Sequence, residues 1–138
     1  MDRQKILIVD DDVDLCDSLK LILEYAGYDV LVAATKAEGM KKIGTEPPDL
    51  IILDVMIETW QDGFEMSRDL KRDPRFKNMP ILMVTSIEEK TGVEIGSTAG
   101  DPVWLPVDAF LDKPVLPEVL LAEIRKLLQS PQAEPFPR

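Results

Sequence analysis

The stretch "KILIVDDDVD", residues 5–14, joins four consecutive apolar residues directly to three consecutive aspartates. The apolar run is short, rich in Ile and Val, and lacks polar alternation, which is typical of a strand covered on both faces of a sheet. Apolar runs of strand length recur at 29–33, 49–53, 80–84 and 108–111. The first stretch therefore predicts one strand of a parallel sheet, with a cluster of carboxylates where that strand ends.

Helical patterns separate these five runs. Apolar residues recur every three or four positions between Asp12 or Asp14, which are placed to start a helix, and Gly27, which is placed to end it. This pattern predicts a helix over 13–26, and similar patterns predict helices over 36–44, 64–72 and 117–128. The alternation predicts an α/β fold, a doubly wound five-stranded parallel sheet with helices on both faces.

One segment interrupts the alternation. Residues 91–106, "TGVEIGSTAGDPVWLP", hold three glycines and two prolines where a fourth helix belongs. We expect at most a short helix near 87–95, followed by an irregular loop, so the fourth helix region should be irregular.

The last residues, "SPQAEPFPR", are rich in proline and predict a disordered tail or the stub of a linker over 129–138, after one domain over 1–128.

Composition excludes several classes of protein. The net charge of −10 argues against binding nucleic acid or an anionic membrane, and no apolar run approaches the roughly 18 residues of a membrane span, so a cytoplasmic location is expected. The chain has no histidine, which excludes Ser-His-Asp and Cys-His catalysis and histidine-ligated zinc. Cys16 is the single cysteine; its apolar neighbours indicate a packing residue.

Polar residues follow directly after four of the five expected strands. They are residues 10–12, Asp54, residues 85–86 and, directly before Pro114, residues 112–113, and in a parallel sheet they emerge at one edge. Two carboxylates about 4 Å apart repel by roughly 4 kcal/mol at an effective dielectric constant near 20. A third carboxylate adds to this repulsion, and the positive charge of one lysine does not offset the total. A hard divalent cation does, and oxygen ligands favour Mg²⁺ or Mn²⁺. With a hydroxyl and an ammonium beside it, the edge predicts a site for a phosphoryl group.

Four motifs, "ILIVDDD", "DLIILDVM" followed by "DGFE", "PILMVTS" and "FLDKP", extend this prediction. In this order and spacing, over residues 5 to about 128, they resemble the receiver domain of a two-component response regulator. The resemblance implies that Asp54 is the phosphoacceptor, which takes its phosphoryl group from a sensor histidine kinase or a histidine phosphotransfer protein. It implies that Asp10 and Asp11 hold Mg²⁺, Asp11 directly and Asp10 through water. The Met56 backbone carbonyl is implied as a further ligand.

The same resemblance assigns three further roles. Thr85 would hydrogen-bond one phosphoryl oxygen, and Lys113 would neutralise another. Phe110 occupies the position of the switch aromatic, which turns inward when Thr85 moves toward the phosphoryl group. Such a domain receives and loses a phosphoryl group rather than turning over a substrate, and its altered surface binds a downstream protein target. No output domain follows Leu128, so the protein acts by protein contact or the sequence belongs to a longer chain.

The sequence also departs from the family pattern. The loop after the expected phosphoacceptor, "MIETWQDG", lacks the family's proline and glycine and is longer, and the interval from Thr85 to Phe110 exceeds the family norm. The family's usual output and dimer face, formed by the fourth helix, fifth strand and fifth helix, must therefore be built differently in this protein.

Two alternatives stay open at this point. One is a phosphorylation-independent binding module that keeps the receiver fold. The other is an Mg²⁺-dependent phosphatase of the haloacid-dehalogenase kind, with Asp10 as nucleophile and Asp12 as general acid. Asp12 also fits a helix cap, which we expect to be its role rather than that of a ligand.

Overall fold

The fold centres on one five-stranded parallel sheet. The computed structural model describes residues 3–54, 60–85, 107–113 and 115–129. Its strands are β1 (Lys5–Val9), β2 (Asp29–Ala33), β3 (Leu50–Leu53), β4 (Ile81–Thr85) and β5 (Ala109–Asp112). Their order in the sheet is β2-β1-β3-β4-β5, and each neighbouring pair is parallel. The predicted fold class is confirmed, and each strand boundary lies within one residue of its prediction.

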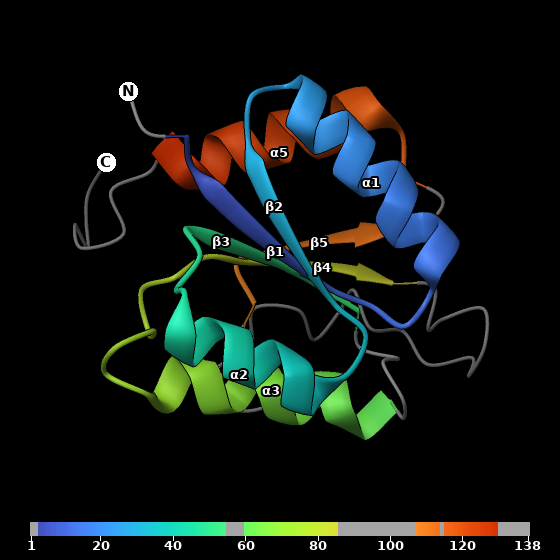
Figure 1. The fold of residues 1–138 in the computed structure, drawn as a ribbon. Coiled ribbons are helices and arrows are strands. Elements are labelled where there is room, and N and C mark those ends of the chain that lie inside the picture. Colours follow the sequence, from blue (N-terminus) through green and yellow to red (C-terminus); the bar gives the residue numbers. More distant parts are fainter. Residues whose placement is uncertain (1–2, 55–59, 86–106, 114, 130–138) are drawn as a thin grey trace.

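Helices cover both faces of this sheet (Figure 1). The described helices are α1 (Val13–Tyr25), α2 (Lys36–Thr45), α3 (Trp60–Arg72) and α5 (Pro117–Gln129). Helices α1 and α5 lie over one face, and α2 and α3 lie over the other (Figure 1). None of the helices that the structure describes is long and apolar enough to cross a bilayer. The irregular region expected near 87–106 and most of the expected tail lie outside the described residues.

The start of α3 differs from its prediction. The apolar spacing begins at Phe64, which led us to expect the helix from 64, but it begins at Trp60. The residues between include an Asp-Gly pair, which is typical of turns. Gly63 is buried within the helix, and burial at this position is consistent with a helix despite the weak helix propensity of glycine.

The core consists of two clusters, one on each face of the sheet. Strand residues that face α2 and α3 are Leu7, Val9, Ile51, Leu53, Ile81 and Met83. Those that face α1 and α5 are Ile6, Ile8, Leu50, Ile52, Leu82 and Val84. Successive strand residues point to opposite faces, so a sheet that is covered twice needs an uninterrupted apolar run. This explains why these strands lack polar alternation.

Helix α1 begins and ends where the sequence predicts. Asp12 is its N-cap, and its Oδ1 accepts a hydrogen bond from the Leu15 backbone N–H at 3.1 Å, so the expected cap role is confirmed. Gly27 follows the last turn with φ of 104°, a left-handed conformation that glycine adopts without strain. Cys16 is buried on the inner side of this helix, and burial raises the pKa of its thiol to about 12. The thiol therefore stays protonated and serves packing.

The start of α2 offers a test of helix capping by residues outside the carboxylate cluster. The Thr35 hydroxyl accepts a hydrogen bond from the Glu38 N–H at 3.1 Å, and Glu38 Oε1 accepts one from the Ala34 N–H at 2.8 Å. Thr35→Ala removes one of these partners and should lower the free energy of unfolding by about 1 kcal/mol. Urea denaturation measures this loss. Thr45→Ala, at the exposed end of the same helix, is the matched control and should change stability by less than about 0.5 kcal/mol. An equal loss in both variants would contradict the capping assignment.

Candidate functional site

The carboxyl ends of the strands bring two acids from distant parts of the chain together. Val9 and Leu53 are register partners of β1 and β3, so Asp10 and Asp54 leave the sheet side by side. The Asp10 N–H still donates to the Ala33 carbonyl, and the Asp54 N–H to the Val9 carbonyl, both at 3.0 Å. Because their backbones remain tied to the sheet, both carboxylates stay at the edge of the core, and each residue is only 4% exposed.

Lys113 connects these two acids. It follows β5, and its Nζ lies 3.0 Å from Asp10 Oδ2 and 3.1 Å from Asp54 Oδ2. Burial disfavours the charge of this ammonium, but the attraction of Asp54 and the hydrogen bond to Asp10 outweigh burial and raise the pKa of Lys113. One cation is therefore shared between two buried carboxyl groups.

The shared cation does not fully balance the site. Burial, together with the nearby charge of Asp54, raises the pKa of Asp10 to about 6 from an ordinary value of 3.8. Hydrogen bonds act in the opposite direction, because Oδ1 of Asp10 accepts from the Asp12 N–H at 3.0 Å and Oδ2 accepts from Lys113. These two contacts fix the orientation of the carboxyl group. The raised pKa of Asp10 therefore reflects a shortage of positive charge at the site and not a loosely held side chain.

A third acid completes a group with the geometry of a cation site. Asp11 is exposed, and it offers one carboxylate oxygen that lies within 4.8 Å of oxygens from Asp10 and Asp54. Three hard oxygen donors and a deficit of positive charge fit Mg²⁺ or a similar ion far better than a soft metal. The described residues thus match the chemistry of the expected metal.

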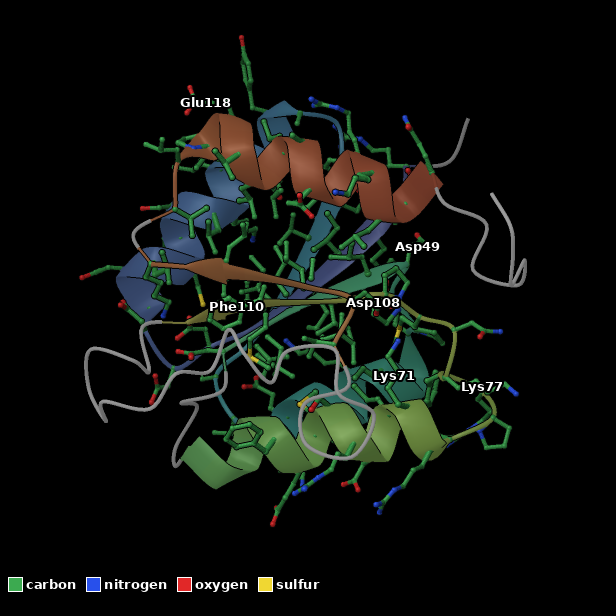
Figure 2. All side chains as sticks on the ribbon, turned by 180° about the vertical axis from the view of Figure 1, so that it is seen from behind. Asp49, Lys71, Lys77, Asp108, Phe110 and Glu118 are labelled. Atoms are coloured by element: carbon green, nitrogen blue, oxygen red, sulfur yellow. The ribbon has the colours of Figure 1, made fainter. Side chains whose placement is uncertain are left out.

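The other predicted site residues are placed less completely. Thr85 is the last residue of β4, with Asp112 as its register partner in β5, so its backbone lies at the same edge. Met56 falls outside the described residues. Phe110 lies in β5 and packs, half-buried, against the core cluster under α2 and α3 (Figure 2). The roles assigned to all these residues stay predictions.

One contact in the site was not predicted from the sequence. The hydrogen bond from the Asp12 N–H to Asp10 Oδ1 joins residues two positions apart. Aspartate side chains commonly accept from the backbone N–H two residues on, so the Asp-Asp-Asp run carried a signal for this turn. The backbone of Asp12 therefore helps to orient the Asp10 carboxyl group, while its side chain caps α1.

Comparison with known proteins decides the family. Residues 6–125 match the model of the response regulator receiver domain. The chain belongs to this family. This receiver domain is 36% identical over 127 residues to the alkaline phosphatase synthesis transcriptional regulatory protein PhoP of Bacillus subtilis. It is 37% identical over 125 residues to the DNA-binding dual master transcriptional regulator RpaA of Synechocystis. The matches cover 92% and 91% of the chain but 49% of each relative, so the chain spans about half the length of these curated relatives.

Solved structures agree with this assignment. A putative response regulator from Chloroflexus aurantiacus superposes with a TM-score of 0.81 at 31% identity, over 94% of this chain and 100% of the other. A CheY-like receiver domain protein from Methanospirillum hungatei superposes with a TM-score of 0.78 at 34% identity, over 92% of this chain and 94% of the other. The comparisons identify a phosphorelay signalling domain, and they favour neither the phosphatase nor the phosphorylation-independent module.

Proposed function

We propose that this receiver domain accepts a phosphoryl group on Asp54 from the phosphohistidine of a sensor histidine kinase or a histidine phosphotransfer protein. The observation that carries the proposal is the ammonium of Lys113, held 3.0 and 3.1 Å from the buried carboxyl groups of Asp10 and Asp54. Phosphoryl transfer depends mainly on positioning and on neutralising charge, and this edge of the sheet provides both. The phosphorylated surface then binds a downstream protein target.

The transfer itself is a substitution at phosphorus. An oxygen of the Asp54 carboxylate attacks, the new O–P bond forms, and the N–P bond to the donor imidazole breaks. The released imidazole nitrogen takes up a proton, and the product is an aspartyl phosphate on this chain. Lys113 stands where it can neutralise one phosphoryl oxygen, and Thr85, at the end of the neighbouring strand, is the donor we assign to another.

We assign the cation site to the carboxylates of Asp10, Asp11 and Asp54 and to the backbone carbonyl of Met56. Mg²⁺, or Mn²⁺, supplies positive charge there against the carboxylates and the phosphoryl oxygens when it is bound. The close grouping of the three carboxylate oxygens supports this assignment. The buried acids hold the site in place, while exposed Asp11 faces solvent, from which an ion arrives.

The output rests on a switch within β4 and β5. We propose that Thr85 moves toward the phosphoryl group and that Phe110 then turns further inward, which alters the surface beside β5. The half-buried packing of Phe110 supports this, because the side chain already touches the core but is not enclosed by it. The domain acts as an acceptor that is phosphorylated and dephosphorylated, rather than as a turnover enzyme.

We place the domain at residues 1–128, with 129–138 as a tail or linker, although Gln129 is still the last residue of α5. The family match over 6–125 supports a domain of about this extent. The cytoplasmic location expected from the sequence stays a prediction.

Mg²⁺ binding should displace a proton near pH 6. Asp10 has a pKa of about 6 before the ion binds, so about half of the molecules carry its proton at that pH, and a carboxylate must be ionised to hold a metal. We expect about half a proton released per ion at pH 6 and almost none at pH 8. Calorimetric titration in two buffers with different ionisation enthalpies measures this number. The same release at both pH values would contradict the assigned protonation of Asp10.

Acetyl phosphate provides the test of the proposed function. Incubated with this small phosphoryl donor and Mg²⁺, the protein should gain the mass of one phosphoryl group, and with EDTA in place of Mg²⁺ it should gain none. A gain that disappears in Asp10→Ala but persists in Asp54→Ala would instead support the phosphatase chemistry. No gain in any condition would support the phosphorylation-independent module.

A further inference from the structure

Positive charge is concentrated in one short part of this acidic protein. Residues 68–77, "RDLKRDPRFK", hold five of the chain's 16 Lys and Arg residues and two of its 26 Asp and Glu residues. This stretch therefore carries a net charge of +3, while the rest of the chain carries −13. It comprises the end of α3 and the turn before β4, so it lies at the amino ends of the strands, the edge opposite the carboxylate site.

Two of the five cations already have structural partners. Lys71 Nζ lies 2.8 Å from Asp108 Oδ2 and donates to the carbonyls of Lys77 and Met79 (Figure 2). Arg75 pairs with Asp73 at 2.8 Å, and its guanidinium lies 4.8 Å from the centre of the Phe76 ring. These contacts hold the turn against the end of α3.

The other three cations define what we call the basic patch: Arg68, Arg72 and Lys77. Among the residues that the structure describes, no carboxylate lies within ion-pair distance of their side chains. Arg68 and Arg72 are four residues apart on α3 and so share a face, where like charges repel. Lys77 sits in a turn closed by hydrogen bonds from the Phe76 and Lys77 N–H groups to the Asp73 carbonyl. Arg72 and Lys77 are exposed and Arg68 is half-buried, so the basic patch presents charge to solvent from a rigid base.

Stabilisation of the helix end does not explain this arrangement. Cations near the carboxyl end of a helix offset its negative pole, and the effect fades beyond the last turn. Lys71 and Arg72 already lie in that turn. Arg68 lies before it and Lys77 lies after the helix has ended, so neither is placed for this purpose.

We propose that the basic patch is a docking surface for an acidic segment of a partner protein, separate from the phosphoacceptor edge. Guanidinium groups bind carboxylates through paired hydrogen bonds, and a rigid base lowers the cost of ordering them. A patch this small matches a short peptide. A DNA duplex is straight over a much longer distance, and it would meet the acidic remainder of the surface as well as the patch.

A labelled deca-glutamate peptide is the probe for this surface. Its affinity, measured by fluorescence anisotropy at low salt, should fall at least tenfold in Arg68→Glu/Arg72→Glu. The control variant Lys41→Glu/Arg125→Glu changes the net charge equally at exposed positions of α2 and α5 and should change affinity less than threefold. Arg68→Gln/Arg72→Gln removes the cations without adding acids, and thermal melts of all variants verify folding. Binding of the wild type should weaken steeply as salt is raised.

Three outcomes would overturn the proposal. The first is no peptide binding by the wild type at low salt, and the second is an equal loss in the patch and control variants. The third is tighter binding of a DNA duplex, or of vesicles containing phosphatidylserine, than of the peptide. Acetyl phosphate labelling should be unchanged in both arginine variants, so a failure of this proposal is separate from a failure of the proposed phosphoacceptor function.

Discussion

Asp54→Ala is expected to abolish phosphorylation by acetyl phosphate, reducing the labelled fraction at least 100-fold below that of the wild type. The two other carboxylates of the cluster are poor substitutes. Both oxygens of Asp10 accept hydrogen bonds, one from the Asp12 N–H and one from the Lys113 ammonium, so an attack on phosphorus by either oxygen would cost one of these contacts. Asp11 is exposed, outside the contacts of Lys113. Intact mass spectrometry after a fixed incubation with Mg²⁺ measures the labelled fraction.

The variant should fold normally. Asp54→Ala keeps the backbone hydrogen bond from residue 54 to Val9, and it removes a negative charge that opposes the ionisation of Asp10. Asp17→Ala removes an exposed carboxylate from α1 and is the matched control, which should label as the wild type does. Undiminished labelling of Asp54→Ala would contradict the phosphoacceptor assignment, as would equal loss in both variants.

Asp10→Asn is expected to make the metal-free protein more stable and to weaken Mg²⁺ binding at the same time. A pKa raised by about two units corresponds to roughly 3 kcal/mol of unfavourable ionisation at neutral pH. Asparagine has one carbonyl oxygen, so it keeps only one of the two hydrogen bonds that Asp10 accepts, which costs about 1 kcal/mol. The net gain in the free energy of unfolding should be about 2 kcal/mol at pH 7 in EDTA.

This gain should depend on pH in a defined direction. Because the pKa of Asp10 is higher in the folded protein than in the unfolded chain, its favourable contribution is complete below about pH 4 and is lost as pH rises through about 6. At pH 4 the wild type carries the proton, so the advantage of Asp10→Asn should vanish. Urea denaturation of both proteins at pH 4 and pH 7 measures the difference. A difference that does not change with pH would show that ionisation of the buried Asp10 carboxyl group is not its cause.

The same substitution should reduce Mg²⁺ affinity at least tenfold, as measured by calorimetry. Loss of a residue that only hydrogen-bonds a metal ligand commonly lowers metal affinity 10- to 100-fold. Asp10→Asn removes a charged oxygen of the carboxylate cluster itself. Asp17→Asn, which neutralises an exposed acid on α1, is the control and should leave both stability and affinity nearly unchanged. Unaltered Mg²⁺ affinity in Asp10→Asn would remove Asp10 from the site. The two expected results together would show that Asp10 lowers the stability of the metal-free protein while it helps to hold the ion.

Much of the fold could be predicted because its strands are covered on both faces. Runs such as residues 6–9 must then be apolar throughout, and Gly27 marks the end of α1 by a conformation that other residues rarely adopt. The start of α3 could not be predicted, because Asp62 and Gly63 are typical of a turn, whereas the helix begins at Trp60 and includes both.

The candidate site was predictable to the level of the strand ends and no further. Parallel strands bring Asp10 and Asp54 to one edge wherever their side chains point. The sequence does not state that Lys113 lies almost equally far from both acids, or that the two carboxyl groups are buried, since these depend on side-chain packing. The raised pKa of Asp10 follows from that burial, and so it emerges only with the structure.

The position of the phosphoryl group is the most direct test of the central claim. Borohydride converts an aspartyl phosphate to homoserine, which tandem mass spectrometry locates within a peptide. After labelling with acetyl phosphate and Mg²⁺, the wild type should carry homoserine at position 54 and at no other aspartate. Homoserine at position 10 or 11, or a labelled protein that yields no homoserine, would contradict the assignment of Asp54 as the phosphoacceptor.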